Sequence, residues 1–239
     1  MAYVFDLHQL QTIALNEASA YQTASPFPYI VLDNFLKPAC AKEIIENFPS
    51  PESPVDWDRY GNPGFEMKIA SSKEEQFPAP VRHALHDLNS GPFIRFLEQI
   101  TGIDHLFADP HLLGGGVHLC GPEGHLGIHA DFNWHPKLRA HRRVNMMVYF
   151  NENWLPQYDG DLELWSTDAS HCVKSISPKF NRAVIFNAQS NAFHGHPRPL
   201  KLPPGQWRRS IAMYYYSAQR PEHEIHAPHN TRYKGRDVP

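Results

Sequence analysis

The stretch Arg142–Phe150 reads Arg-Arg-Val-Asn-Met-Met-Val-Tyr-Phe and carries the clearest secondary-structure signal in the chain. From position 144 onward every even position is apolar, whereas the odd positions mix polar and apolar side chains. Because successive residues of a β-strand point to opposite faces, this alternation predicts a strand with one buried face. We expect the apolar face to pack on helices and the mixed face, with Arg143, Asn145, Met147 and Tyr149, to line a pocket.

Shorter segments on both sides of this stretch have the composition of strands and are separated by Gly, Pro, Asn and Asp, the usual turn residues. Strands are predicted at residues 28–35, 115–119, 162–165, 173–176, 183–187 and 207–216. Helices are predicted at residues 7–20, 38–48, 81–88 and 93–100, where apolar residues recur at helical spacing. Gly102 is expected to end the last helix.

A helical part followed by several short strands, without βαβ alternation, predicts an α+β, mainly β fold. The likeliest arrangement of such strands is an antiparallel double sheet, the double-stranded β-helix or jelly roll, flanked by the N-terminal helices. We expect one domain over residues 1–239, divided into a helical support region (1–110), a jelly-roll catalytic core (111–219) and a C-terminal tail (220–239). Residues 50–78, rich in Pro, Ser and charge, are predicted to be mostly loop, and the tail is predicted to form no element.

Composition places the chain among ordinary single-domain globular proteins: 239 residues, 41% of them apolar, suffice for one sizeable core. No apolar run has the length of a membrane span, and the first residues lack the features of a secretory signal. With a net charge of −3 and no basic patch, we expect neither a nucleic acid nor a membrane as partner. Three widely spaced cysteines without a C-x-x-C pair indicate free thiols in a reducing, cytoplasmic compartment.

A His-x-Asp pair precedes the alternating strand, in Gly127-Ile128-His129-Ala130-Asp131-Phe132. On a strand, residues two apart share a face, so His129 and Asp131 would offer an imidazole and a carboxylate to one point in space. The tripeptide alone is weak evidence, because polar residues of a surface strand show the same spacing. Its weight comes from two later segments.

The first later segment, Ser190–His196, contains His194 and His196, and the second contains Arg208-Arg209-Ser210. Two histidines and one carboxylate form the facial set that holds non-haem iron(II) and leaves coordination positions open. The side chains of Arg208 and Ser210 share a strand face and would suit the carboxylate of a bound ligand. Parity alone leaves His194 and His196 as competing metal ligands, because both lie on one face.

The ordered series of these motifs resembles the iron(II)- and 2-oxoglutarate-dependent oxygenases, specifically their prolyl 4-hydroxylase-like branch. The resemblance covers residues 114–219 and is looser over residues 1–110. Its motifs are a Gly-rich strand, His-x-Asp, Arg-Arg-Val-Asn up to Tyr-Phe-Asn, Asp-Gly-Asp-Leu-Glu-Leu, Phe-Asn-Arg-x-Val-Ile-Phe-Asn, His-Gly and Arg-x-Ser. It implies a jelly roll that binds Fe(II), uses 2-oxoglutarate and O2 as co-substrates, and is a candidate for ascorbate dependence.

The resemblance also implies the roles of individual residues. His129, Asp131 and His194 are the implied metal ligands and catalytic residues, because in the branch the ligand is the first His of the His-Gly pair. His196 then lies behind the ligands or at the surface.

On the co-substrate side, the resemblance selects Arg208 with Ser210 rather than Arg209. It implies that Tyr149 donates its hydroxyl to the same far carboxylate of 2-oxoglutarate. Asn145, on the same strand face as Tyr149, is expected to flank the co-substrate. An arginine suits this role because its planar fork matches a carboxylate and remains charged.

The expected reaction is hydroxylation of a C–H bond, with a prolyl or other amino-acid residue as first candidate and a small molecule as the other. By the same resemblance Asp131 argues against chlorination, because halogenating relatives carry a small residue at that position. Four aromatic residues suit either a substrate rim or the core, namely Trp134, Trp154, Tyr158 and Trp165. Two other functions fit the sequence: a jelly-roll binding module without catalysis, and a cupin-like metalloenzyme that does not use 2-oxoglutarate. The sequence leaves the oligomeric state open.

Overall fold

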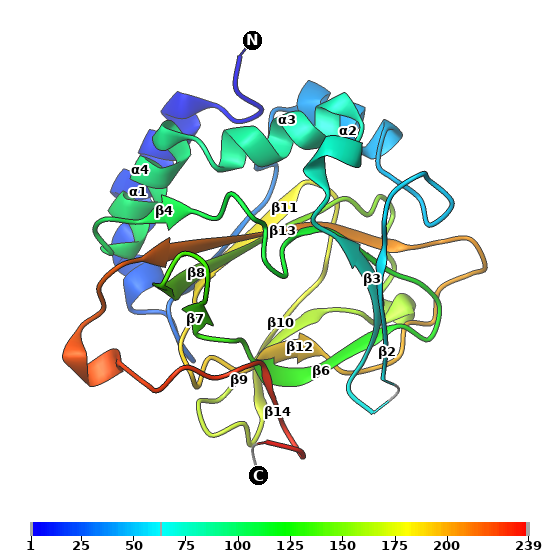
Figure 1. Cartoon of the computed structure of the whole chain (residues 1–239). Coiled ribbons are helices and arrows are strands. Elements are labelled where there is room, and N and C mark those ends of the chain that lie inside the picture. Colours follow the sequence, from blue (N-terminus) through cyan, green and yellow to red (C-terminus); the bar gives the residue numbers. More distant parts are fainter. Residues whose placement is uncertain (1, 63, 238–239) are drawn as a thin grey trace.

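The computed structural model describes residues 2–62 and 64–237. Four helices lie together on one side of the sheet in Figure 1: α1 (Leu7–Gln22), α2 (Pro38–Glu46), α3 (Ala79–Leu88) and α4 (Gly91–Thr101). Asp6 caps α1 by accepting a hydrogen bond from the backbone N–H of Gln9, and Gly102 ends α4 in the left-handed conformation. None of these helices has the length and apolar character needed to span a membrane.

Fourteen strands, all paired antiparallel, form one strongly curled sheet among the described residues. The first seven are β1 (Tyr29–Leu32), β2 (Asp58–Asn62), β3 (Glu66–Ser71), β4 (Phe107–Ala108), β5 (Gly116–Cys120), β6 (His125–Ala130) and β7 (Trp134–His135). The others are β8 (Ala140–Tyr149), β9 (Leu162–Trp165), β10 (Cys172–Ile176), β11 (Arg182–Asn187), β12 (His194–His196), β13 (Arg208–Ser217) and β14 (Arg232–Tyr233). Short 3-10 helices occupy Glu74–Gln76, Pro156–Tyr158 and Glu222–Glu224.

The sheet order is β1-β11-β8-β13-β5-β3-β6-β12-β9-β10, so the path turns at β3 from one half of the sheet to the other. In Figure 1 the half with β11, β8 and β13 lies next to the helices, and the half with β6, β12, β9 and β10 lies below it. This arrangement confirms the predicted α+β, mainly β jelly roll with N-terminal helices.

Strand β8 behaves as its alternation predicts over most of its length. Val144, Met146 and Val148 are fully buried in the cluster that the helices complete, whereas Asn145 and Met147 line a pocket on the other face. A β-bulge interrupts the alternation opposite Tyr215/Tyr216, where the ladder passes from Val144 directly to Arg142. Arg142 therefore shares the pocket face with Asn145, and the prediction that Arg143 lies on that face is wrong.

Residues 50–78 have more residues outside strands than within them, but the prediction of a loop missed the paired strands β2 and β3. Strand β3 pairs with β5 through Ile69–Ser71 and with β6 through Glu66 and Met67, so it joins the two halves of the sheet. The mixed polar and apolar residues of β3 suit a strand with one face in a pocket, and such a strand lacks a strong apolar signal.

The C-terminal tail also forms an element that the sequence did not predict. Strand β14 pairs with β6, with Arg232 opposite Ala130 and Tyr233 opposite His129. It covers the last residues of β6, after β3 has covered the first ones. The edge of β6 at these residues offers unpaired backbone N–H and C=O groups to another strand. Pairing with these groups accounts for β14, and the composition of the tail gives no sign of it.

Strand β12 approaches β6 closely at Gly195, which lies between His194 and His196, the two residues of β12 that pair with β6. A Cβ atom on Gly195 would lie 2.7 Å from the backbone oxygens of both Leu126 and Gly127. The ladder between β12 and β6 is irregular at this point, and it keeps His194 directly opposite His129. Only glycine permits this approach.

We expect Gly195→Ala to lower the free energy of unfolding by about 1–3 kcal/mol, because the added methyl group forces β12 away from β6. Urea unfolding followed by circular dichroism measures the change. The matched control is Gly61→Ala, because a Cβ at Gly61 meets nothing within 4 Å, and it should cost no stability. Equal stability of the two variants would contradict the close approach.

Candidate metal centre

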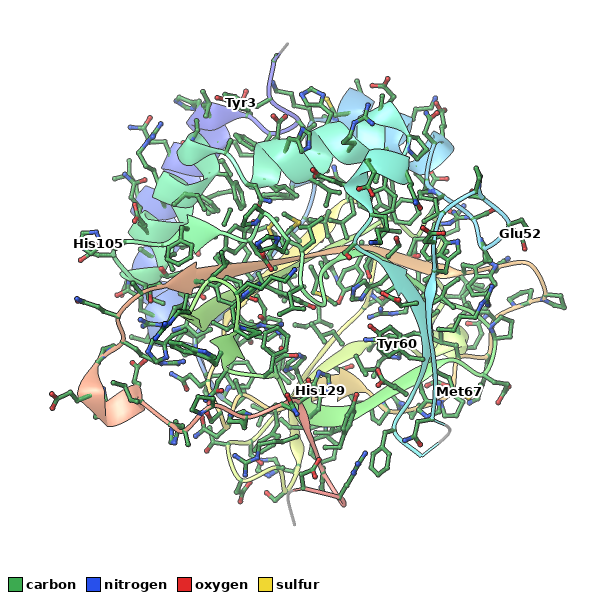
Figure 2. All side chains as sticks on the ribbon, viewed as in Figure 1. Tyr3, Glu52, Tyr60, Met67, His105 and His129 are labelled. Atoms are coloured by element: carbon green, nitrogen blue, oxygen red, sulfur yellow. The ribbon has the colours of Figure 1, made fainter. Side chains whose placement is uncertain are left out.

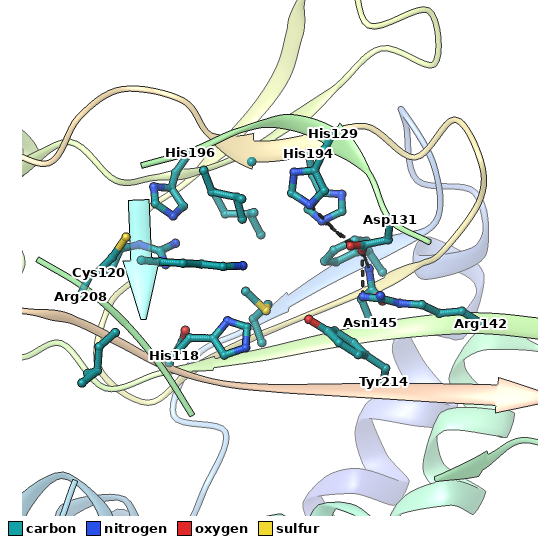
Figure 3. A pocket seen from close by; sticks show the side chains of 18 residues that line it. His118, Cys120, His129, Asp131, Arg142, Asn145, His194, His196, Arg208 and Tyr214 are labelled. Carbon is teal, nitrogen blue, oxygen red and sulfur yellow. Dashed lines mark hydrogen bonds and ion pairs between the residues drawn. The ribbon is translucent and has the colours of Figure 1, made fainter. Parts of the chain in front are cut away.

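Three side chains from two adjacent strands converge at one end of a pocket between the sheet halves. His129 lies on β6, Asp131 follows that strand directly, and His194 lies on β12. One potential ligand atom from each lies within 4.8 Å of the others. Nε2 of His129 is 3.5 Å from Oδ1 of Asp131, and Nε2 of His194 is 3.4 Å from Oδ2 (Figure 3). The structure thus brings the three predicted ligands together.

The two imidazoles are oriented by backbone carbonyls. Nδ1 of His129 is 2.8 Å from the oxygen of Gly127, and Nδ1 of His194 is 2.9 Å from the oxygen of Ala192. A carbonyl oxygen only accepts hydrogen bonds, so each Nδ1 carries the proton and each Nε2 presents a lone pair to the shared point. Burial, with a smaller effect of His129, lowers the pKa of His194 to about 4, so this ring is neutral at physiological pH. This donor set fits a divalent metal ion.

The Asp131 carboxylate is held by two donors on one of its oxygens. Nη2 of Arg142 and Nδ2 of Asn145 donate to Oδ2 at 2.9 and 2.7 Å, and Nε of Arg142 donates to Oδ1 of Asn145 at 2.7 Å. Burial raises the pKa of Asp131, but Arg142 and the imidazoles of His194 and His129 outweigh burial and hold that pKa well below its usual range. Asp131 is therefore a carboxylate whose Oδ1 faces His129.

Arg142 is the largest side chain that is fully buried, with 1% of its surface exposed. Its guanidinium carbon lies 3.4 Å from the ring centre of Tyr214 and 4.5 Å from that of Phe132, so two aromatic faces enclose the cation. Sequence reasoning missed this residue, because the bulge in β8 reverses the strand parity before Asn145. The sequence shows the pair Arg142-Arg143, but it does not show which of the two side chains faces the pocket.

The same pocket holds a second cluster at the end away from the metal group. Arg208 and Ser210 line it from β13, and Lys68, His118 and Cys120 line it from β3 and β5. Ser210 pairs with His118 on one side and with Tyr149 on the other. We call this enclosed space, from Asp131 to Arg208, the inner pocket.

Arg208 is 4% exposed and is held in place by neutral groups. Its Nε donates to the oxygen of Gly160 at 2.8 Å, and its Nη2 lies 3.5 Å from the Tyr149 hydroxyl. Tyr149 is fully buried behind Arg208 rather than lining the inner pocket. Arg209 lies on the other strand face and lines a separate surface depression with Trp154.

Two histidines of the inner pocket were not expected to be site residues. Burial, with a further effect of Lys68, lowers the pKa of His118 to about 3. Burial, with a further effect of Arg208, holds the pKa of His196 well below its usual range. The sequence could have placed His196 in the pocket, because it lies on the same strand face as His194. The place of His118 in the pocket depends only on the pairing of β5 with β13, which the sequence does not show.

An outer cleft of about 520 Å³ opens on the metal group from the solvent side. It shares Lys68, His129, Asp131 and Arg142 with the inner pocket. Five aromatic rings line the outer cleft, those of Tyr60, Phe132, Trp134, Tyr214 and Tyr233, and Tyr214 also lines the inner pocket. Figure 2 shows Tyr60 beside the β2–β3 hairpin and His129 on the lower half of the sheet.

Of the four aromatic residues considered for a substrate rim, Trp134 alone lines the outer cleft. Trp154 and Tyr158 line the surface depression beside Arg209. Trp165 packs against the cluster around Ile128, under the ammonium group of Lys234. Tyr233 of β14 contacts the ring of His129, with the ring centres 5.5 Å apart, so the tail contributes a wall of the cleft.

Comparisons with known proteins agree with this geometry. Residues 115–230 match the family model of the 2OG-Fe(II) oxygenase superfamily, a segment that contains His129, Asp131, His194, Arg208 and Ser210. No curated protein sequence matches the chain.

Solved structures share the fold at low sequence identity. A Trichoplax adhaerens prolyl hydroxylase in complex with a hypoxia inducible factor peptide has a TM-score of 0.64 and 19% identity, over 88% of this chain and 92% of that one. A Pseudomonas putida prolyl-4-hydroxylase has a TM-score of 0.59 and 14% identity, over 87% of this chain and 98% of that one. HygX from Streptomyces hygroscopicus, with nickel, 2-oxoglutarate and hygromycin B bound, has a TM-score of 0.56 and 10% identity, over 84% of this chain and 87% of that one.

These likenesses establish the jelly-roll fold and agree with the resemblance to the prolyl 4-hydroxylase-like branch. The family match extends over the strands that carry the metal group and the buried arginine at the other end of the inner pocket. Over residues 115–230, just under half of its length, the chain therefore matches the 2OG-Fe(II) oxygenase superfamily.

Proposed function

We propose that the protein is an Fe(II)- and 2-oxoglutarate-dependent dioxygenase that hydroxylates a C–H bond of its substrate. The observation that carries the proposal is the inner pocket, which has two imidazole nitrogens and a carboxylate at one end and a buried guanidinium at the other. Two histidines and one carboxylate leave iron positions open for other ligands. The opposite cation suits the far carboxylate of a 2-oxo dicarboxylic acid.

His129, Asp131 and His194 would hold the iron. Bound iron supplies the chemistry that couples decarboxylation of 2-oxoglutarate to succinate and CO2 with hydroxylation of the substrate by O2. The carbonyls of Gly127 and Ala192 accept from Nδ1 of the two imidazoles and so hold both rings with Nε2 toward the metal position. By resemblance, ascorbate is a candidate reductant for this reaction.

Arg208 and Ser210 would hold the far carboxylate of 2-oxoglutarate, and Tyr149, which was expected to bind it directly, would position the Arg208 guanidinium from behind. The bonds of Arg208 to Gly160 and Tyr149 fix its guanidinium at the end of the inner pocket. Asn145 was expected to flank the co-substrate, and it lines the inner pocket, but its amide nitrogen donates to Asp131. We assign Asn145 and Arg142 to positioning the Asp131 carboxylate, so that Oδ1 of Asp131 is the oxygen presented to the metal.

The outer cleft would take the substrate, because it opens on the metal group and is large enough for several side chains or a drug-sized molecule. A prolyl or other amino-acid residue of a peptide is the first candidate, supported by the prolyl hydroxylase folds and by aromatic walls that suit a pyrrolidine ring. A small molecule is the second, as in the hygromycin B complex of HygX. The three free cysteines suit a reducing compartment, and we propose the cytoplasm.

Replacing Asp131 by alanine removes the only anionic ligand, so we expect Asp131→Ala to lower the Fe(II) affinity at least about 100-fold. Metal analysis after anaerobic dialysis, with Mn(II) binding followed by electron paramagnetic resonance, measures the loss. Asp104→Ala, which removes an exposed carboxylate, is the matched control and should retain the metal of the wild type. Unchanged metal content in Asp131→Ala would remove this residue from the site.

Replacing Arg208 by methionine removes the buried cation but none of the metal ligands. We expect Arg208→Met to raise the apparent KM for 2-oxoglutarate at least about tenfold with iron retained, because a charged hydrogen-bonding partner is lost. A succinate-release assay measures this, with Arg209→Met as the matched control. Activity that does not depend on 2-oxoglutarate would instead favour a cupin-like metalloenzyme, and absence of succinate release in the wild type would favour a binding module.

A further inference from the structure

The charges of the inner pocket are unequal between its two ends. Asp131 is the only carboxylate among its lining residues, and Arg142 is paired with it at 2.9 Å. The remaining charged side chains of the lining are Arg208 and Lys68. An anionic group that enters this end of the inner pocket therefore meets two cations.

Strand register places Lys68 at the Arg208 end. Ala70 of β3 pairs with His118 of β5, which pairs with Ser210 of β13, so all three share the pocket face. Residues two apart on a strand share a face, so Lys68 and Arg208 lie on that face one step further along their strands. Neighbouring strands are about 4.8 Å apart, so two long side chains separated by one strand reach the same volume.

The ammonium group of Lys68 has two neighbours that line the outer cleft, Glu66 and the ring of Tyr60, whose centre is 4.9 Å away. Its side chain is 16% exposed, and its nearest carboxylate oxygen, on Glu66, is 3.5 Å away. Glu66 lines the outer cleft but not the inner pocket, whereas Lys68 lines both. A lysine is a flexible point charge, so Lys68 can turn from Glu66 toward an anion in the inner pocket.

The same end of the pocket carries a further unsatisfied group. Nδ1 of His196 is buried without a hydrogen-bond partner among the described residues. His118 and Cys120, the other polar groups here, are close enough to both Lys68 and Arg208 to be affected by each charge. A buried end with two cations and an unpartnered imidazole nitrogen is complementary to a carboxylate.

We propose that Lys68 is a second cation of the co-substrate subsite and binds, together with Arg208, the far carboxylate of the 2-oxo dicarboxylic acid. This inference rests on the proposed function and adds a specificity-determining residue to it. Arg208 supplies a fixed planar fork, and Lys68 supplies a mobile charge from the β2–β3 hairpin. The pair selects dicarboxylic over monocarboxylic 2-oxo acids.

The test compares two probes on Mn(II)-loaded protein without O2, by isothermal titration calorimetry. 2-Oxoglutarate carries the far carboxylate, and 2-oxopentanoate has the same chain length without it. We expect Lys68→Met to weaken 2-oxoglutarate binding about tenfold and to leave 2-oxopentanoate binding unchanged. Lys68→Arg should restore most of the affinity, and Lys174→Met, on the exposed strand β10, is the matched control.

The variant Arg208→Met distinguishes failure of the proposed role of Lys68 from failure of the proposed function. If it weakens 2-oxoglutarate binding and Lys68→Met does not, the role of Lys68 is overturned and the proposed function stands. If Lys68→Met weakens both acids equally, the inference is also overturned, because Lys68 then acts on the shared 2-oxo acid end. If the Mn(II)-loaded wild type binds neither acid, the proposed function itself fails. Circular dichroism of each variant, with retained Mn(II) binding, establishes that the fold is intact.

Discussion

The pairing of β12 with β6 is the constraint on which the rest of the site depends. It places His194 opposite His129, with ring centres 4.4 Å apart, although 65 positions separate them in the chain. Hydrogen bonds between strands fix this distance, and Gly195 lets the two backbones approach without a clash. Strand register therefore places both histidines, and Asp131 lies one residue beyond β6; sites on strands are held with greater precision than sites on loops.

Electrostatics divides the inner pocket into two functional ends. At the metal end the charges of Asp131 and Arg142 balance, and the aromatic faces of Tyr214 and Phe132 enclose the cation. At the other end Arg208 has neutral partners, and Lys68 pairs with Glu66, which lines the outer cleft but not the inner pocket. A ligand with two anionic groups fits this division, with a chelating group at the metal and a second carboxylate at the cations. The outer cleft meets the pocket at the metal end, so a substrate reaches the reacting centre without crossing the cation end.

Much of this arrangement follows from the order of residues along the chain. Alternation in β8 predicted which face packs on the helices, because burial of one strand face leaves a period of two in the sequence. The pairs His129/Asp131 and Arg208/Ser210 obey the same period. Parity failed at Arg142, because a β-bulge adds one residue and reverses every side chain beyond it.

Other features depend on contacts between distant segments and leave little local signal. Strand β3 has a mixed composition because one face borders the inner pocket, so its strand character and the position of Lys68 were hidden. Strand β14 exists because the last residues of β6 need backbone partners. The hydrogen bonds of Asn145 to Asp131 and Arg142 depend on both the bulge and the end of β6.

The central claim is that one ferrous ion and one molecule of 2-oxoglutarate bind together in the inner pocket. Anaerobic titration of the Fe(II)-loaded protein with 2-oxoglutarate, followed by visible absorbance, tests it most directly. The account predicts an absorption band that saturates at one equivalent of 2-oxoglutarate per bound iron. Iron binding without any such band, or no iron binding, would contradict the account.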